Sequence, residues 1–399
     1  MSIVNAMTGA ATDSGFRVKG TTDSSPGGAR LAVADNLGLS GPEYFTATVD
    51  GNLLSCEATG IDPATQYYWA WELDGALDTG VTGRSRTFPT EDDPASFTFT
   101  CTSCGGLNPQ YPAHTGPAPN RVSNHPVADD IRLAAPLFHI QDGDLHYGDI
   151  GSGKHGLTNP DIDTIRAMYD SVLATGQGRL YRDINFVQMW DDHDFGVGNS
   201  DRTTPLRDQV AQVYRERFPS YDLPSSGGIY HAFKCARVQV IVLDTRYYRD
   251  PITDPAPRTL LGQAQKTWLE NVLSTSTAET MFVVQSQRWN NTGTKTNIGS
   301  YPEERAELVS MFGDHGWLDK GRMAMMSGDV HGSGIASPAG NQFGGFPLYQ
   351  GGSFDSTPAP YANGHDMDLG WVSARGQYLR FEVADPGRYI HVTGTVWRH

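Results

Sequence analysis

The chain has 399 residues, 38% of them hydrophobic and 19% charged, so it is long enough for two domains with buried cores. Its formal net charge of −15 at pH 7 argues against a nucleic-acid backbone as the main partner, because contacts to phosphates need a basic surface. No apolar stretch approaches the length of a membrane span, and the 45 glycines and 24 prolines favour strands and loops over long exposed helices.

The first segment, up to about Asp92, predicts a small all-β sandwich. Short alternating runs separated by Gly, Pro and Asp turns fall at residues 16–19, 30–34, 44–49, 53–58, 67–73 and 84–88. The turn before Tyr67 and Tyr68 resembles the corner of immunoglobulin-like and fibronectin type III modules, where a tyrosine fixes a strand crossing. Residues 90–94 have the composition of a linker, so we expect a module over residues 1–92 and a second domain over residues 93–399.

From residue 95 onward, strand-like runs alternate with helical segments. The predicted strands are residues 97–104, 137–141, 186–190, 238–244, 281–285 and 323–327, and two more lie near 378–383 and 389–396. The predicted helices are residues 162–175, 205–218, 260–275 and 303–315. This order predicts an α/β (α+β) domain, in which functional residues gather at the carboxyl ends of strands.

Residues that can bind metal stand at the ends of four of these strands. They are Cys104 at the end of the first strand, Asp144 and Tyr147 after the second, residues 191–194 after the third, and Asp329 with His331 after the last. Two carboxylates about 4 Å apart repel by roughly 4 kcal/mol at an effective dielectric near 20, so a converging set must either protonate or hold a multivalent cation, and a hydrolytic site favours the cation. Thiolate and phenolate ligands indicate a trivalent or borderline-soft metal such as iron, and the remaining oxygen ligands suit calcium, magnesium or manganese.

Taken together, these motifs resemble the alkaline phosphatase D (PhoD-like) family of the calcineurin-like metallophosphoesterase superfamily. The similar motifs are Ser-Cys at 103–104, Gly-Asp-x-x-Tyr at 143–147, Trp-Asp-Asp-His-Asp at 190–194 and Gly-Asp-Val-His at 328–331. Segments 238–246 and 260–269 are also family-like, and the resemblance extends to the N-terminal module. It implies a two-layer β-sandwich flanked by helices, with metals at one edge.

The resemblance also implies a role for each site residue. Cys104 and Tyr147 would bind iron(III), Asp144 would bridge both metals, and Asp192 would bind the second ion. The second ion would be calcium, with manganese, magnesium or zinc as alternatives. The other two expected metal ligands are Asp329 and His331, the catalytic residues are His193, Asp192 and Asp144, and the supporting residues are Asp149, Asp191, Asp194 and Arg246.

The function implied by the resemblance is hydrolysis of phosphomonoesters, phosphodiesters or both by attack of a metal-bound hydroxide. We expect no covalent phosphoenzyme, because no Ser or Thr stands with a partner base. The substrate would be a small-molecule, lipid or polymer phosphate ester. Two alternatives stay open, a phospholipase D-like phosphodiesterase and a non-catalytic extracellular binding module with a structural metal site. The sequence does not define the oligomeric state.

Three features depart from these expectations. Cys101 places a second thiol beside Cys104, and residues 285–288 (Gln-Ser-Gln-Arg) stand where the wider superfamily usually has a histidine ligand. Residues 1–20 contain no basic n-region, apolar core or twin arginine, so they encode no export signal. The resemblance nevertheless implies an extracytoplasmic mature form.

Overall fold

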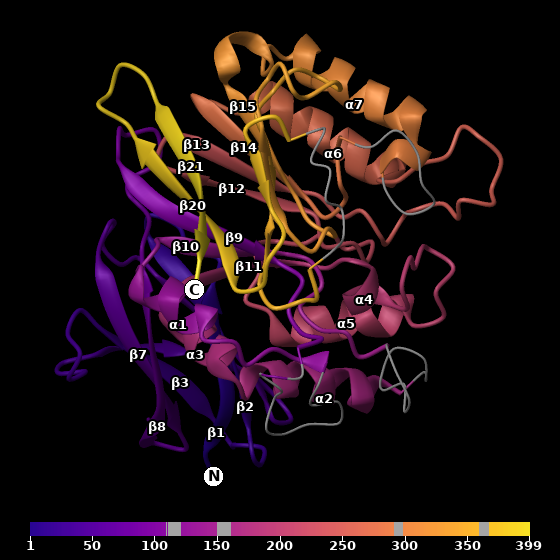
Figure 1. Cartoon of the computed structure of the whole chain (residues 1–399). Helices are drawn as coiled ribbons and strands as arrows, with labels where there is room; N and C mark the ends of the chain where they lie inside the picture. The colour runs from indigo at the N-terminus through magenta and orange to yellow at the C-terminus, as the bar shows by residue number, and fades with distance from the viewer. Residues whose placement is uncertain (109, 111–120, 150–160, 291–297, 359–366) are drawn as a thin grey trace.

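The structure is a computed structural model that describes residues 1–108, 110, 121–149, 161–290, 298–358 and 367–399 (Figure 1). Eight strands make up its N-terminal part within residues 1–92. They are β1 (Ile3–Gly9), β2 (Gly15–Thr22), β3 (Ala29–Ala34), β4 (Glu43–Thr46), β5 (Thr48–Asp50), β6 (Leu53–Thr59), β7 (Gln66–Leu73) and β8 (Ala76–Arg86). The predicted strands are confirmed, whereas β1 was not predicted. The hydroxyl of Tyr67 accepts a 2.9 Å hydrogen bond from the backbone N–H of Asp62, so the predicted tyrosine does fix this turn.

These strands form two layers, one of which continues into the rest of the molecule. Strands β4-β3-β7-β8 form one sheet, and β1-β2-β6-β5 form one end of a much larger sheet. The junction is a parallel bridge between Gly9 on β1 and Phe186 on β11 (Asn185–Met189). A Cβ on Gly9 would lie 2.5 Å from the Phe186 carbonyl oxygen, so only glycine permits this approach. The expected boundary at residue 92 lies between β8 and β9 (Phe97–Ser103), yet hydrogen bonding crosses it; the division into two domains and the immunoglobulin-type assignment stay predictions.

Two sheets face each other in the remainder of the chain. The first contains β9, β10 (Phe138–Asp142), β11, β18 (Gly352–Ser353), β20 (Gln377–Ala384) and β21 (His391–Arg398). The second runs in the order β12 (His231–Cys235), β13 (Val238–Val242), β14 (Thr280–Gln285), β15 (Met323–Ser327), β17 (Leu348–Gln350), β16 (Ser333–Ala336) and β19 (Gly370–Val372). Phe99 on β9 packs edge-on against Phe282 on β14 with ring centroids 5.0 Å apart, so the core lies between the two sheets.

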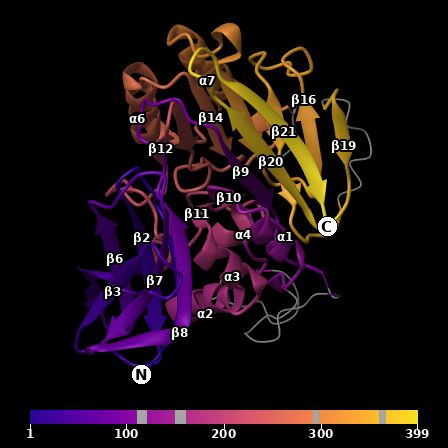
Figure 2. The same cartoon turned by 90° about the vertical axis from the view of Figure 1, so that its left-hand side faces the viewer.

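Helices cover the outer faces of this pair of sheets (Figures 1 and 2). They are α1 (Val127–Leu133), α2 (Ile162–Leu173), α3 (Gly176–Asp183), α4 (Asp192–Phe195), α5 (Arg207–Arg217), α6 (Gly262–Thr275) and α7 (Pro302–Asp314), with 3-10 turns at Ile298–Ser300 and Asp319–Gly321. Leu269 of α6 and Leu308 of α7 join a buried cluster with Met325 of β15. Helix α7 begins with Pro302 and two glutamates, which suits the free N–H groups and positive dipole of a helix start.

The topology explains where the site forms. Strands β9, β10 and β11 run parallel to one another, and so do β13, β14 and β15 in the facing sheet. The carboxyl ends of parallel strands meet at one edge of a sheet.

Within the described residues, none of the helices has the length and apolarity needed to cross a bilayer.

Candidate active site

Three of the predicted ligand residues adopt an unusual backbone conformation directly after their strands. Cys104, Asp144 and Asp329 have φ angles of 54°, 56° and 67°, a left-handed region that costs a non-glycine residue about 1–3 kcal/mol. Close packing of the loops accounts for the glycine before Asp144. A Cβ on Gly143 would lie 2.6 Å from the Cβ of Asp191. The surrounding structure therefore holds these side chains in place against local strain.

Cys104, Asp144, Tyr147 and His331 meet on one side of the site. The Cys104 thiol donates to Asp144 Oδ2 over 3.6 Å, and the Tyr147 hydroxyl donates to the same oxygen over 3.0 Å. The Tyr147 hydroxyl also lies 2.9 Å from His331 Nε2. Burial and the Asp144 charge raise the pKa of both Cys104 and Tyr147 well above their usual values. Only a strong positive charge would make this thiol and this phenol ionise together.

A backbone contact to Nδ1 fixes the orientation of the His331 ring. Its Nδ1–H donates to the carbonyl oxygen of Thr357 over 2.7 Å, which leaves Nε2 as the free acceptor facing Tyr147. A backbone partner of this kind sets the tautomer of a metal-binding histidine. Ligand atoms of Cys104, Asp144 and His331 lie within 4.8 Å of one another.

A cluster of carboxylates forms the other side of the site. Asp144, Asp191, Asp192 and Asp329 each offer an oxygen within 4.8 Å of the others. Burial and the charges of Asp191 and Asp192 raise the pKa of Asp329 to about 8. The backbone N–H of Asn199 donates to Asp192 Oδ2 over 2.6 Å and holds that carboxylate toward the cluster.

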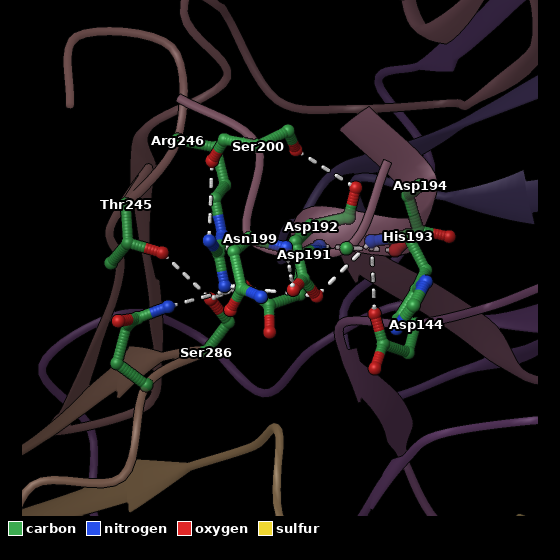
Figure 3. Close-up of polar contacts among 12 residues, drawn as sticks. Asp144, Asp191, Asp192, His193, Asp194, Asn199, Ser200, Thr245, Arg246 and Ser286 are labelled. Carbon is green, nitrogen blue, oxygen red and sulfur yellow. Dashed lines mark hydrogen bonds and ion pairs between the residues drawn. The ribbon is translucent and has the colours of Figure 1, made fainter. Parts of the chain in front are cut away.

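Asp191 is neutralised on one oxygen only (Figure 3). The fully buried Arg246 donates to its Oδ1 over 2.6 Å, and Ser286 Oγ donates to the same oxygen over 2.5 Å. Gln287 adds a weaker contact at 3.5 Å. Asp191 Oδ2 is buried and has no hydrogen-bond partner among the described residues. The sequence placed Asp191 as a supporting residue, and the geometry also gives it an oxygen free for a cation.

Asp194 ties two of the loops together. Its carboxylate accepts the backbone N–H of Leu145 over 2.8 Å and that of Asp191 over 3.0 Å. Burial raises its pKa to about 7 even though these N–H groups lower it. One oxygen of Asp194 accepts from the loop after β10 and the other from the loop after β11, so this carboxylate joins the two loops. Both oxygens are thereby occupied, which fits the predicted supporting role.

His193 forms a close pair with Asp149. Its Nδ1 lies 2.8 and 2.9 Å from the two oxygens of Asp149, and the backbone N–H of Gly198 donates to Asp149 over 3.1 Å. Burial lowers the pKa of His193, but Asp144, Asp192 and Asp149 outweigh it and raise that pKa to about 11. The side chain is 17% exposed, so the imidazole can present Nε2–H to a ligand.

The structure therefore brings together the six predicted ligands and the supporting residues. Cys101 lies apart, in the core, where its thiol donates to Asp142 Oδ2 over 3.4 Å. Ser286 and Gln287, in the segment where the wider superfamily usually has a histidine, contact Asp191 and supply no imidazole. Asn199 and Thr357 were missed, because they act through backbone atoms and no motif signals such a role.

Comparisons with known proteins identify similar phosphatases. Residues 177–338 match the model of a family described as PhoD-like phosphatase. Alkaline phosphatase D of Bacillus subtilis (strain 168) is 25% identical over 325 residues, which span 69% of this chain and 53% of that protein. The chain thus spans about half the length of this curated relative.

Solved structures show the same fold. The structure of PhoD matches with a TM-score of 0.75 and 18% identity, over 99% of this chain and 90% of that one. Purple acid phosphatase PPD1 from yellow lupin (Lupinus luteus) seeds matches with a TM-score of 0.68 and 9% identity, over 96% of this chain and 70% of that one. The chain is thus similar to PhoD-like phosphatases in the matched segment and in the related sequence, and it shares the mixed α/β fold of the two solved structures.

Proposed function

We propose that this chain is a metal-dependent hydrolase of phosphoric esters. The observation that carries the proposal is the convergence of four carboxylates, a thiol, a phenol and an imidazole at one sheet edge. Burying such a set in its charged form costs free energy, because carboxylate, thiolate and phenolate groups away from water are stabilised only by nearby positive charge.

The donor set fits two cations of different character. With Asp191 paired to Arg246, the remaining candidates are the carboxylates of Asp144, Asp192 and Asp329, the thiolate of Cys104 and the phenolate of Tyr147. Five negative charges would balance a trivalent and a divalent ion. The unpartnered Asp191 Oδ2 adds a hard oxygen on the carboxylate side, which suits calcium, manganese or magnesium better than a soft ion.

We assign Cys104, Tyr147 and His331 to iron(III), Asp192 and Asp329 to a divalent ion, with calcium as the first choice, and Asp144 to both. When bound, such ions supply Lewis-acid chemistry, in which they polarise the phosphoryl group and acidify water. The protein's own residues set the positions of the ligands. Arg246 and Ser286 hold Asp191, Asn199 holds Asp192, and Thr357 holds His331.

His193 is the group we assign to the substrate. Asp149 fixes its Nδ1 and keeps the imidazole protonated on that atom, so Nε2 is the atom that faces a bound ester. A donor at this position stabilises charge on a phosphoryl oxygen or delivers a proton to the departing alcohol.

The activity is tested with 4-nitrophenyl phosphate and bis(4-nitrophenyl) phosphate, which separate monoesterase from diesterase activity. Asp144→Asn should remove both metal and turnover, because an amide cannot act as an anionic bridge between two ions. Asp163→Asn, at an exposed position of α2, is the matched control and should behave as wild type. Wild-type protein that holds metal and hydrolyses neither ester would overturn the proposal in favour of a structural metal site.

The iron assignment has its own test. A phenolate on iron(III) gives a visible charge-transfer band, so concentrated wild-type protein should be coloured and dithionite should bleach it. Tyr147→Phe keeps the packed ring but removes the donor oxygen, so the band should disappear while the protein stays folded. A colourless, fully active wild type with only zinc, calcium or magnesium bound would reject iron and leave the hydrolase proposal standing.

A further inference from the structure

Arg375 lies beside the site, outside every motif discussed so far. It stands between β19 and β20 and is half-buried. Its guanidinium donates through Nε to the Ser356 carbonyl (3.3 Å), through Nη1 to Asn108 Oδ1 (3.1 Å) and through Nη2 to Thr357 Oγ1 (3.0 Å). All three acceptors are neutral.

No carboxylate of the described residues lies within salt-bridge distance of this guanidinium. Asp355 belongs to the same hydrogen-bond network, but its oxygens accept from Asn108 (2.6 Å) and Ser123 (2.7 Å). The Asn108 amide therefore stands between Asp355 and the arginine. By contrast, Arg237 contacts Asp385 directly at 2.5 Å. Arginine has five N–H groups, and the three bonds above leave one on each terminal nitrogen for a further acceptor.

Thr357 connects this cation to the metal side of the site. Its hydroxyl accepts from Arg375, and its carbonyl accepts from His331. Arg375 therefore adds positive charge near His331 in a chain whose net charge is −15.

We propose that Arg375 binds a second anionic group of the substrate, so that preferred esters carry a carboxylate or a further phosphate on the alcohol part. This inference rests on the proposed hydrolase function. The two remaining N–H groups belong to the two terminal nitrogens of the guanidinium, and a carboxylate or phosphate offers oxygens to both. The cations assigned above take the scissile phosphoryl group, which leaves Arg375 for the second anion.

The test compares phenyl phosphate with 3- and 4-carboxyphenyl phosphate. Arg375→Gln should raise KM for a carboxylated ester about tenfold and leave KM for phenyl phosphate within about twofold, since one charge-assisted contact is lost. Arg375→Lys should fall between the two, because an ammonium keeps the charge but loses the fork. Arg380→Gln is the matched control, since Arg380 pairs with Glu382 on β20.

Other outcomes overturn the inference. An equal rise in KM for charged and uncharged esters, or loss of bound metal in Arg375→Gln, would make Arg375 a positioning residue for the loop that holds His331. Calorimetric binding of phenylphosphonate and 4-carboxyphenylphosphonate needs no turnover and so separates the two proposals. If wild type hydrolyses no ester yet prefers the carboxylated phosphonate through Arg375, the anion site stands and the hydrolase proposal fails; equal affinities would reject the anion site.

Discussion

His193 depends on a partner that is distant in the sequence. Asp149 lies 44 positions before it, after β10 rather than β11, and contacts Nδ1 with both oxygens. The Gly198 backbone N–H holds Asp149 in turn. The imidazole is therefore oriented by contacts that neither ligate a metal nor touch the substrate in our assignment.

Asp149→Asn should lower kcat by about 10- to 100-fold while metal content stays near wild type, because an amide lacks the negative charge that helps keep His193 doubly protonated with an N–H at Nε2. Steady-state kinetics and elemental analysis on the same preparations measure both quantities. Loss of metal in proportion to activity would instead make the pair part of the metal shell.

At the same scale, the sequence predicted which residues would converge better than it predicted the residues that contact them. Cys104, Asp144 and Asp329 each follow a recognisable strand, so a local pattern marks them. Ser286 and Arg375 have no such pattern. Their contacts arise from the packing of the two sheets and of the loop between β19 and β20, and a single sequence does not predict such packing.

At the scale of elements, the join between β1 and β11 decides how the N-terminal strands sit. The two strands meet at one Cα pair, Gly9 with Phe186, and the Gly9 site is closed on two sides by carbonyl oxygens of Phe186 and Pro219. Side-chain packing strengthens this join, since Phe88 lies against Phe138 with ring centroids 5.6 Å apart.

Gly9→Ala should lower the free energy of unfolding by about 1–3 kcal/mol, because its methyl group would overlap backbone atoms that cannot move independently. Urea unfolding measures the change. Gly28→Ala is the control, since a Cβ at Gly28 meets no atom within 4 Å. Equal stability of both variants would mean that the two parts join only loosely at this bridge.

The sequence predicted the longer helices correctly, because their hydrophobic periodicity extends over several turns. Helices α2, α5, α6 and α7 match the predicted segments within a few residues, because each presents a regular buried face. Helix α3 was missed, since Gly176 and Gly178 lower its helical propensity. The short strands β16 to β19 were also missed, because two to four residues carry no measurable period.

At the scale of the whole molecule, several buried carboxyl groups have pKa values far above the ordinary value of an aspartate. Burial raises the pKa of Asp142 and Asp194 to about 7 and that of Asp329 to about 8. These values describe the metal-free chain. In the unfolded chain each would titrate near 3.8, the ordinary value from which they are shifted.

Metal-stripped protein should therefore lose stability as pH rises from about 4 to 8. In that window the unfolded state has released protons that the folded state still binds, so each pH step favours unfolding. We expect the stripped protein to be less stable at pH 8 than at pH 5 by more than about 2 kcal/mol, and metal to reduce this slope. Urea midpoints across this range, with and without chelator, measure it; parallel profiles would mean that no cation neutralises the cluster.

The contact between Tyr147 and His331 has a consequence for biosynthesis. These two residues lie 184 positions apart in the sequence. Cys104, Asp144 and Tyr147 therefore emerge from the ribosome long before His331, the residue that Tyr147 contacts. The early part of the chain can fold while synthesis continues, since N-terminal regions generally fold first. The site itself stays open on one side until the last third of the chain has emerged. Loading of the proposed metal site would therefore be a late event, after translation has passed Thr357, whose carbonyl holds His331.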